Sequence, residues 1–244
     1  LVRHIRDKGA MRAGLSTVDL DANSLLNKIL ATPEMQDREL ASSVTVAENY
    51  NYPATADEKY HVVAYDFGVK TNSLREFAKF GCRVTVVPSE TTAAEVLALQ
   101  PDGIFLSNGP GDPASMTSVV MEIKKLAASQ KPMFGICLGH QLIGEAFGGS
   151  TYKLKFGHRG GNQPIKDLTT GKIEITAHNH GFAVDADSLP ADVEVTHINL
   201  NDHTVAGLRH KKLPVFSVQY HPESAPGPHD SEYLFERFID LMNK

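Results

Sequence analysis

Residues 131–142, KPMFGICLGHQL, place a cysteine between two glycines where an apolar run turns polar. The apolar run predicts a short buried strand, and residues 138–149 have the pattern of a helix that ends at glycines. A G-x-nucleophile-x-G segment between strand and helix is typical of a tight turn that exposes its central side chain. The helix's positive end favours a thiolate. The stretch predicts an α/β fold with Cys137 as nucleophile, although a buried packing cysteine fits this motif alone equally well.

The two glycines beside Cys137 are predicted to allow close packing. Gly135 and Gly139 flank the cysteine on either side. A glycine lets a strand and the following helix approach where a side chain would collide. We therefore expect the strand and the helix to pack closely at this turn.

Strands and helices alternate on both sides of this turn between residues 60 and 149. This rhythm predicts parallel βαβ units in a doubly wound, mostly parallel, flavodoxin-like sheet. After residue 150, strand-like runs joined by turn residues predict antiparallel strands appended to the sheet. The expected strands are 61–67, 82–88, 103–108, 132–136, 172–179, 181–185, 193–200, 204–210 and 215–221. The expected helices are 72–81, 93–100, 118–130, 138–149 and 231–244.

The first 58 residues lack this rhythm. They contain one expected helix, 21–31, within polar segments that carry proline and asparagine. We interpret 1–58 as the remnant of a preceding domain plus a linker, and 59–244 as the α/β domain. Residue 1 is not Met and no apolar signal-peptide core follows it, which favours a chain that begins within a longer protein.

The composition excludes several classes of protein. A net charge of −5 gives no basic stripe for nucleic acid and no polybasic patch for a membrane surface. No run of eighteen apolar residues predicts a membrane span. Two cysteines form no disulfide framework, which is typical of a reducing compartment, so a cytoplasmic location is expected.

A thiol nucleophile needs a base and a group that orients the base. The segment VFSVQYHPES, residues 215–224, provides His221 at the end of an apolar strand and Glu223 two residues later. His221 would take the thiol proton and Glu223 would hold the imidazole in one tautomer. Alone, H-P-E is also the sequence of a surface turn; in the order Cys, His, Glu it favours a catalytic triad.

The same chemistry needs donors for a developing oxyanion. The backbone N–H of Leu138, directly after the cysteine, is the expected first donor. The loop SNGPGDP, residues 107–113, follows a strand and is the second candidate. It could also be an ordinary turn, and it matches neither the Walker A nor the dinucleotide-binding pattern.

Together these segments resemble the class I (triad) glutamine amidotransferase domains. The resemblance rests on SNGPGDP, FGICLGHQL and H-P-E, and it covers residues from about 60 to 244. Two further segments, FGHRGGNQP and NHGFAVD, favour the carbamoyl-phosphate synthase branch over the anthranilate, GMP and CTP synthases. The segment HIRDKGAMRAG resembles the end of the N-terminal domain of that branch's small subunit.

The resemblance implies a role for particular residues. It implies Cys137 as nucleophile, His221 as base and Glu223 as the residue that orients it. It places Lys70 near the point where ammonia leaves. It implies that glutamine is held by Gly109, Gly111, Leu138, Gln141, Asn179, Gly181 and Phe182.

The resemblance also implies a partner. In this branch a large synthetase subunit receives ammonia through an internal tunnel and joins it to bicarbonate, for the arginine and pyrimidine pathways. ATP and magnesium are expected on that partner, and no cofactor is expected in this chain.

The eleven histidines raise the question of a metal site. His178 and His180 lie two apart on an expected strand, and His197 and His203 follow. No cysteine or carboxylate completes a familiar ligand spacing, so no metal is expected. His158 belongs to a basic cluster with Lys153, Lys155 and Arg159, for which a solvated face or a contact with the partner subunit is expected. Cys82, which begins a β-branched strand, is expected to be a packing residue.

Three alternatives to this function remain. A triad amidotransferase that serves a different synthase would share most of these motifs. A non-catalytic glutamine-sensing module would keep the fold, and a cysteine peptidase could be built on it. The complete set of Cys137, His221 and Glu223 disfavours the sensing module, and the presence of Gln141 and Phe182 disfavours the peptidase.

Overall fold

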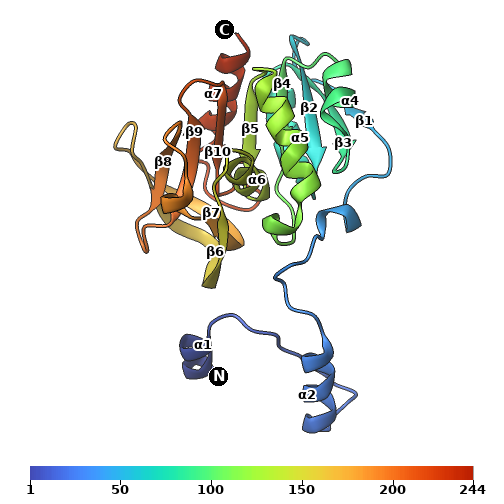
Figure 1. Ribbon diagram of the computed structural model, residues 1–244, viewed down its shortest axis with the longest axis vertical. Helices are drawn as coiled ribbons and strands as arrows, with labels where there is room; N and C mark the ends of the chain where they lie inside the picture. Colours follow the sequence, from blue (N-terminus) through green and yellow to red (C-terminus); the bar gives the residue numbers. More distant parts are fainter. Residues whose placement is uncertain (244) are drawn as a thin grey trace.

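The chain folds around one twisted sheet of ten strands. The computed structural model describes residues 1–243 (Figure 1). The order of the strands in the sheet is β1-β3-β2-β4-β5-β10-β9-β8-β6-β7. The strands are β1 (Tyr50–Tyr52), β2 (Tyr60–Asp66), β3 (Cys82–Pro88), β4 (Gly103–Leu106), β5 (Met133–Ile136), β6 (Thr151–Asp167), β7 (Ile173–Val184), β8 (Val193–Asn199), β9 (Val205–His210) and β10 (Val215–Val218).

One half of the sheet is parallel and the other is antiparallel. Strands β3, β2, β4, β5 and β10 pair in parallel, and the short edge strand β1 runs against β3. Strands β9, β8, β6 and β7 continue the sheet in antiparallel pairs. The predicted fold class, a doubly wound parallel sheet with appended antiparallel strands, is confirmed.

Helices cover both faces of the parallel half. The helices of this half are α3 (Thr71–Lys79), α4 (Ala93–Ala98), α5 (Thr117–Ala128), α6 (Leu138–Ala146) and α7 (Tyr233–Met242). Helices α4, α5 and α6 bury their apolar residues on one face, and α3 and α7 bury theirs on the other. Because side chains alternate along a strand, Ile104 and Leu106 of β4 face the first group while Phe105 faces the second.

The second face is rich in aromatic rings. Phe134 of β5 stacks on Phe216 of β10 with ring centroids 4.5 Å apart. It also packs edge-on against Phe235 of α7, at 5.8 Å. Phe134 has no exposed surface. The central pair of strands, β5 and β10, is therefore held by ring packing as well as by backbone hydrogen bonds.

The long strand β6 is the main difference from the sequence prediction. Its segment contains Gly157, Gly160, Gly161 and Pro164, residues that weaken a strand pattern. It pairs with β7 along most of its length, with register shifts between Lys153 and His158 and between Gly160 and Gln163. The bulges accommodate the glycines. The runs 172–179 and 181–185, expected as two strands, form the single strand β7.

The first 58 residues carry the helices α1 (Val2–Lys8) and α2 (Ala22–Ala31), which lie below the sheet in the view of Figure 1. They also include β1, which pairs with β3, so part of the segment expected as a linker is built into the sheet. The helix expected at 21–31 is confirmed, and Asp21 caps it by accepting a hydrogen bond from the Ser24 N–H at 2.6 Å. The segment that follows contacts the α/β domain, because Glu39 forms an isolated bridge with Gly111. Within residues 1–243, no helix is long and apolar enough to cross a membrane.

Truncation of Phe134 should be costly, because its ring fills the space between β5, β10 and α7. We expect Phe134→Ala to lower the free energy of unfolding by about 3–5 kcal/mol. Met121 of α5 is 60% exposed and provides the matched control; Met121→Ala should change stability by less than about 0.5 kcal/mol. Urea unfolding followed by circular dichroism measures both, and equal effects would contradict the packing described here.

Candidate active site

Cys137 sits on a strained turn between β5 and α6. Its backbone has φ 54° and ψ −101°, a region that residues other than glycine rarely adopt. It occupies the N-cap position of α6 and is 5% exposed. Such strain is typical of functional positions. The turn predicted from the flanking glycines is therefore present.

The two flanking glycines are required by close packing. A Cβ on Gly139 would lie 2.2 Å from the carbonyl oxygen of Leu106 in β4. A Cβ on Gly135 would lie 2.8 Å from the backbone of Gly139. Since real Cβ atoms do not approach backbone this closely, any side chain would push α6 away from the sheet. The expectation of close strand–helix packing is confirmed.

The pairing of β5 with β10 brings His221 to the cysteine. The two strands are parallel, with Ile136 opposite Val218, so both chains leave the sheet at the same edge. The Cys137 N–H extends the ladder by donating to the Val218 carbonyl at 2.9 Å. Three residues later, the His221 N–H donates to the carbonyl of Ala177 in β7, also at 2.9 Å.

Glu223 holds the imidazole of His221 from behind. Its Oε1 lies 2.7 Å from His221 Nδ1 and 2.9 Å from Lys70 Nζ. Because a carboxylate accepts, Nδ1 carries a proton and Nε2 is left for the thiol side. Lys70 Nζ also approaches Nδ1 to 3.3 Å, since one oxygen accepts from both groups. The Glu223 side chain has no exposed surface.

The charges of this group shift its titration. Burial opposes the charged form of His221, but the charge of Cys137 and hydrogen bonds to Cys137 and Glu223 outweigh it and raise the pKa of His221 to about 9. Burial also opposes the charged form of Glu223, yet His221 and Lys70 hold its pKa below the ordinary value. By contrast, burial raises the pKa of Cys82 to about 12, which fits the expected packing cysteine.

A cavity of about 1110 Å³ opens next to Cys137. Of the ten residues predicted for the site, Leu138 and Glu223 do not line it; Glu223 lies behind His221. The other eight do: Gly109, Gly111, Cys137, Gln141, Asn179, Gly181, Phe182 and His221. Lys70 lines it too. Residues from the glycine loop, the cysteine turn, β7 and the H-P-E segment thus meet around one space.

Gln141 is oriented by the protein before any ligand binds. Its Nε2 donates to the Phe182 carbonyl at 2.8 Å and to Gln219 Oε1 at 3.0 Å. Both amide donors are therefore engaged. The oxygen of the Gln141 amide is the group that remains to accept a hydrogen bond from a ligand.

The glycine loop passes close to the backbone after β2. A Cβ on Gly109 would lie 2.1 Å from the Phe67 carbonyl oxygen. The loop is also held from the N-terminal segment, because the Asp112 N–H donates to the Arg38 carbonyl at 2.9 Å. Asp37 N–H in turn donates to Asp112 Oδ2, at 2.9 Å.

The N-terminal segment contributes to the cavity, which the sequence pattern did not indicate. Its contributions lie between residues 10 and 38, and they include Arg12 and Met35. Arg12 lies in the segment HIRDKGAMRAG, which resembles the end of a preceding domain, and Met35 belongs to no motif; neither was predicted as a site residue. Only their position in the structure shows that they form part of the wall.

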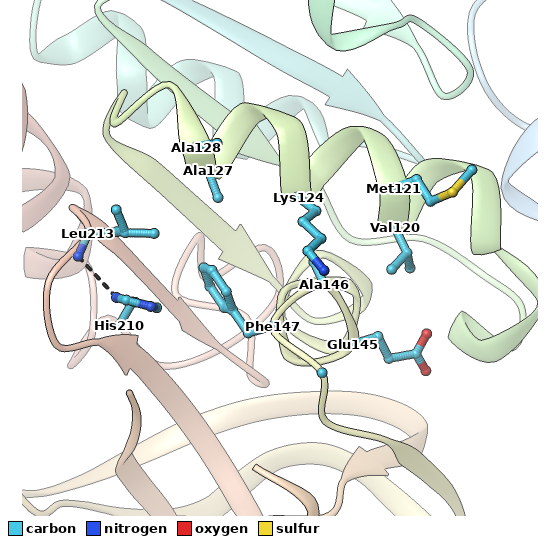
Figure 2. A pocket seen from close by; sticks show the side chains of 11 residues that line it. Val120, Met121, Lys124, Ala127, Ala128, Glu145, Ala146, Phe147, His210 and Leu213 are labelled. Atoms are coloured by element: carbon cyan, nitrogen blue, oxygen red, sulfur yellow. Dashed lines mark hydrogen bonds between the residues drawn. The ribbon is translucent and has the colours of Figure 1, made fainter. Parts of the chain in front are cut away.

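A second pocket lies away from the cysteine (Figure 2). It measures about 490 Å³ and is bounded by α5, the end of α6 and the turn at His210. Its wall is mostly apolar, with Phe147 near the middle, and His210 Nδ1 accepts from the Leu213 N–H at 3.0 Å. It holds no nucleophile and no base paired with a carboxylate. The cavity at Cys137 is therefore the candidate active site.

Comparison with known proteins agrees with this geometry. Residues 63–241 match the family model described as Glutamine amidotransferase class-I. The crystal structure of a protein proposed to be part of a GMP synthase, from Thermoplasma acidophilum, superposes with a TM-score of 0.66 over 77% of this chain and 96% of that one. At 22% identity, that likeness concerns the fold. The chain belongs to the class-I glutamine amidotransferase family and is a glutamine amidotransferase subunit.

More similar relatives are named carbamoyl phosphate synthase small chain. The chain is 58% identical to the one from Chlorobaculum tepidum, with all of this chain and 67% of the relative covered. It is 53% identical to that of Syntrophotalea carbinolica, covering all of this chain and 68% of the relative. It is 49% identical to that of Aquifex aeolicus, covering 99% and 68%. The chain thus spans about two thirds of these relatives.

The raised pKa of His221 gives a pH prediction. Its ring should remain charged up to about pH 9. Since the folded value exceeds the unfolded value of about 6.5, the stability it contributes is complete below pH 6.5 and is lost as pH rises through 9. NMR titration of the ring nitrogens should show a clearly lower pKa in Cys137→Ser, because the interactions with Cys137 are lost. An unchanged value would show that Cys137 does not raise it; exposed His203 is the internal reference.

The packing at Gly139 predicts a stability difference between two glycines. Gly139→Ala should destabilise the fold by about 1–3 kcal/mol, because its Cβ would collide with the Leu106 carbonyl. Gly181→Ala is the matched control, since a Cβ there meets nothing within 4 Å. Thermal unfolding of both variants tests the close approach, and a Gly139→Ala protein as stable as the control would contradict it.

Proposed function

We propose that this chain is the glutamine-hydrolysing subunit of a carbamoyl-phosphate synthase. The observation that carries the proposal is that Cys137 and His221 line one cavity together with Gln141, while Glu223 behind them holds His221 Nδ1 at 2.7 Å. The relatives named carbamoyl phosphate synthase small chain support the choice of synthase. The match to the family model supports the choice of substrate, glutamine.

In the proposed reaction, Cys137 Sγ attacks the carboxamide carbon of glutamine. His221 passes the thiol proton to the leaving nitrogen, the C–N bond breaks, and ammonia departs from a thioester. A water molecule then gives a proton to His221 and attacks the thioester carbon. The C–S bond breaks, glutamate leaves, and the proton returns to the thiol. Glu223 keeps His221 in the tautomer that both transfers need, and Lys70 keeps Glu223 ionised.

The oxyanion of each tetrahedral intermediate would rest on backbone donors. The Leu138 N–H belongs to the first turn of α6, where N–H groups have no partner within the helix. The loop at Gly109 lines the same cavity, and we assign its amides as the second set of donors. Both sets of donors belong to packed backbone, so they need little reorganisation during the reaction.

Glutamine would be held by the residues that surround this point. We assign the binding of the substrate to Gly109, Gly111, Leu138, Gln141, Asn179, Gly181 and Phe182. The amide oxygen of Gln141 is suited to accept from the substrate's ammonium or amide group, since its nitrogen is already engaged. Lys70 and Arg12 contribute positive charge to the wall, which suits the substrate's carboxylate.

The ammonia would be delivered to a large synthetase subunit, where ATP and magnesium drive carbamoyl phosphate formation for arginine and pyrimidine synthesis. We propose residues 59–244 as the glutaminase domain and residues 1–58 as the end of a preceding domain plus a linker. The position of residues 10–38 along the cavity supports a contribution of the preceding region to the glutamine site.

Two other functions make different predictions. An amidotransferase that serves another synthase would hydrolyse glutamine equally well but would not supply a carbamoyl-phosphate synthase large subunit. A glutamine-sensing module would bind glutamine without hydrolysing it. The buried, oriented His221–Glu223 pair favours hydrolysis, because binding alone does not need a base held at 2.7 Å by a carboxylate.

Labelling with a glutamine-like diazoketone tests the nucleophile. Intact mass should show one adduct on the natural chain and none on Cys137→Ser. Glu223→Gln should still be labelled but should hydrolyse glutamine about 10²–10⁴-fold more slowly, because its base is no longer held in the working tautomer. Cys82→Ser is the matched control and should be labelled like the natural chain. Labelling at Cys82 instead would refute the assignment.

The choice of synthase is tested by adding the partner. Glutamine-dependent carbamoyl phosphate formation should appear when the natural chain is mixed with the large subunit of a carbamoyl-phosphate synthase, ATP, magnesium and bicarbonate. Cys137→Ser should support only the reaction that uses added ammonia. Glutamine hydrolysis with no carbamoyl phosphate would point to a different synthase, and glutamine binding with no hydrolysis would point to the sensing module.

A further inference from the structure

Three histidine rings meet on the hairpin of β6 and β7, next to the glutamine cavity. His158 of β6 lies opposite His180 of β7, and His178 precedes His180 by two residues. One ring nitrogen from each lies within 4.8 Å of the other two. From the sequence, His178, His180, His197 and His203 were the candidates and no metal was expected; the cluster instead combines the first two with His158, whose segment did not have a strand pattern. His158 is half-buried rather than part of a solvated basic face.

Two of the rings have their tautomer set by an acceptor. His180 Nδ1 lies 2.7 Å from the Phe182 carbonyl, which can only accept, so Nδ1 carries the proton. His158 Nε2 lies 2.8 Å from Asp202 Oδ2. A carboxylate oxygen accepts, so His158 Nε2 carries the proton and donates it to Asp202. The opposite nitrogens, His158 Nδ1 and His180 Nε2, bear lone pairs in the neutral rings.

The third ring follows the same logic. His178 Nε2 lies 2.9 Å from Thr176 Oγ1. The Thr176 hydroxyl donates to the Gln163 carbonyl, also at 2.9 Å, so its oxygen accepts from His178. His178 Nδ1 therefore bears a lone pair. Asn199 Nδ2, at 3.5 Å, is placed to donate weakly to His158 Nδ1, which agrees with a lone pair there.

The three lone pairs point at one another with no proton between them. His180 Nε2 lies 3.2 Å from His158 Nδ1 and 3.0 Å from His178 Nδ1. A hydrogen bond at these distances would need one ring to be doubly protonated. Each neutral ring already places its proton on the outer nitrogen, which faces Asp202, Thr176 or the Phe182 carbonyl. The space between the three inner nitrogens therefore suits a positive ion.

A divalent transition metal suits this arrangement. Zinc binds neutral histidine nitrogens at about 2.0–2.1 Å, which places tetrahedral ligand atoms about 3.3 Å apart. Each ring donates its other N–H to an oxygen, which is how metal-binding histidines are usually held. Three histidines with a fourth position open to water form a common zinc site. We propose that His158 Nδ1, His178 Nδ1 and His180 Nε2 together bind one divalent transition-metal ion of the zinc class.

The ion would connect the hairpin to the glutamine cavity. His180 lies between Asn179 and Gly181, and all three line the cavity. A metal shared with His158 fixes this segment of β7 to β6 at the register shift that ends at His158. The inference does not depend on the proposed reaction, because the metal takes no part in the steps assigned to Cys137 and His221.

Cobalt and zinc titrations test the site. Cys137→Ser serves as the parent chain, so that the active-site thiol cannot bind the probe. Equilibrium dialysis at pH 7.5 should give one Co²⁺ per parent chain, with the visible d–d bands of a four-coordinate ion and no thiolate charge-transfer band. Zn²⁺ should displace the Co²⁺ and raise the Tm of the parent.

His178→Gln and His158→Gln, each in the parent, should lose at least tenfold in Co²⁺ affinity and should show no Zn²⁺-dependent rise in Tm. Circular dichroism establishes whether each variant is folded. If one variant does not fold, the other still tests the site. His229→Gln removes an exposed histidine outside the cluster and should bind like the parent. No Co²⁺ uptake by the parent, or equal uptake by all four chains, would overturn the proposal.

Discussion

The parallel pairing of β5 with β10 is the contact on which the site depends. Cys137 and His221 are 84 positions apart, yet the register of Ile136 with Val218 makes both segments leave the sheet at one edge. The Cys137 N–H donates to the Val218 carbonyl, which joins the strained turn to the strand that precedes the histidine. The stacked rings of Phe134 and Phe216 hold the same two strands from the α7 side. Backbone pairing and apolar packing thus bring the segments of Cys137 and His221 together, and the two side chains then extend from these segments toward the cavity.

The buried carboxylate of Glu223 is stabilised by two positively charged or hydrogen-bonding neighbours, His221 and Lys70. Glu223 is fully buried, and an isolated buried carboxylate is expensive. One of its oxygens meets both His221 and Lys70, so the negative charge has two partners within 2.9 Å. Removing one partner of such a buried group commonly costs about 3–5 kcal/mol. That coupling explains why the His221 ring has one tautomer and one orientation. In the cluster of His158, His178 and His180, the outer ring nitrogens have oxygen partners and the inner nitrogens face one another.

The sequence predicted the parallel half well, because its strands are short, continuous apolar runs separated by helices that end at glycine or polar residues. Eight of the ten site residues that the motifs and the family resemblance implied line the cavity. The sequence did not predict β6, where four glycine and proline positions hide a strand that bulges accommodate. It also gave no sign that Arg12 and Met35 lie on the cavity wall, because a linker's docking position depends on contacts such as Glu39 with Gly111 that have no local pattern.

By itself, the sequence determined the chemical groups and their local geometry: a cysteine in a glycine-flanked turn, an H-P-E segment, and a glycine loop after a strand. These follow from backbone sterics and periodicity, which act over a few residues. Only the tertiary structure decided which groups meet. In the folded chain Lys70 pairs with Glu223, the Gln141 amide donates to two acceptors, and His158 lies beside His178 and His180. These contacts depend on strand order and register, and register is set by the summed packing of the whole sheet rather than by any one segment.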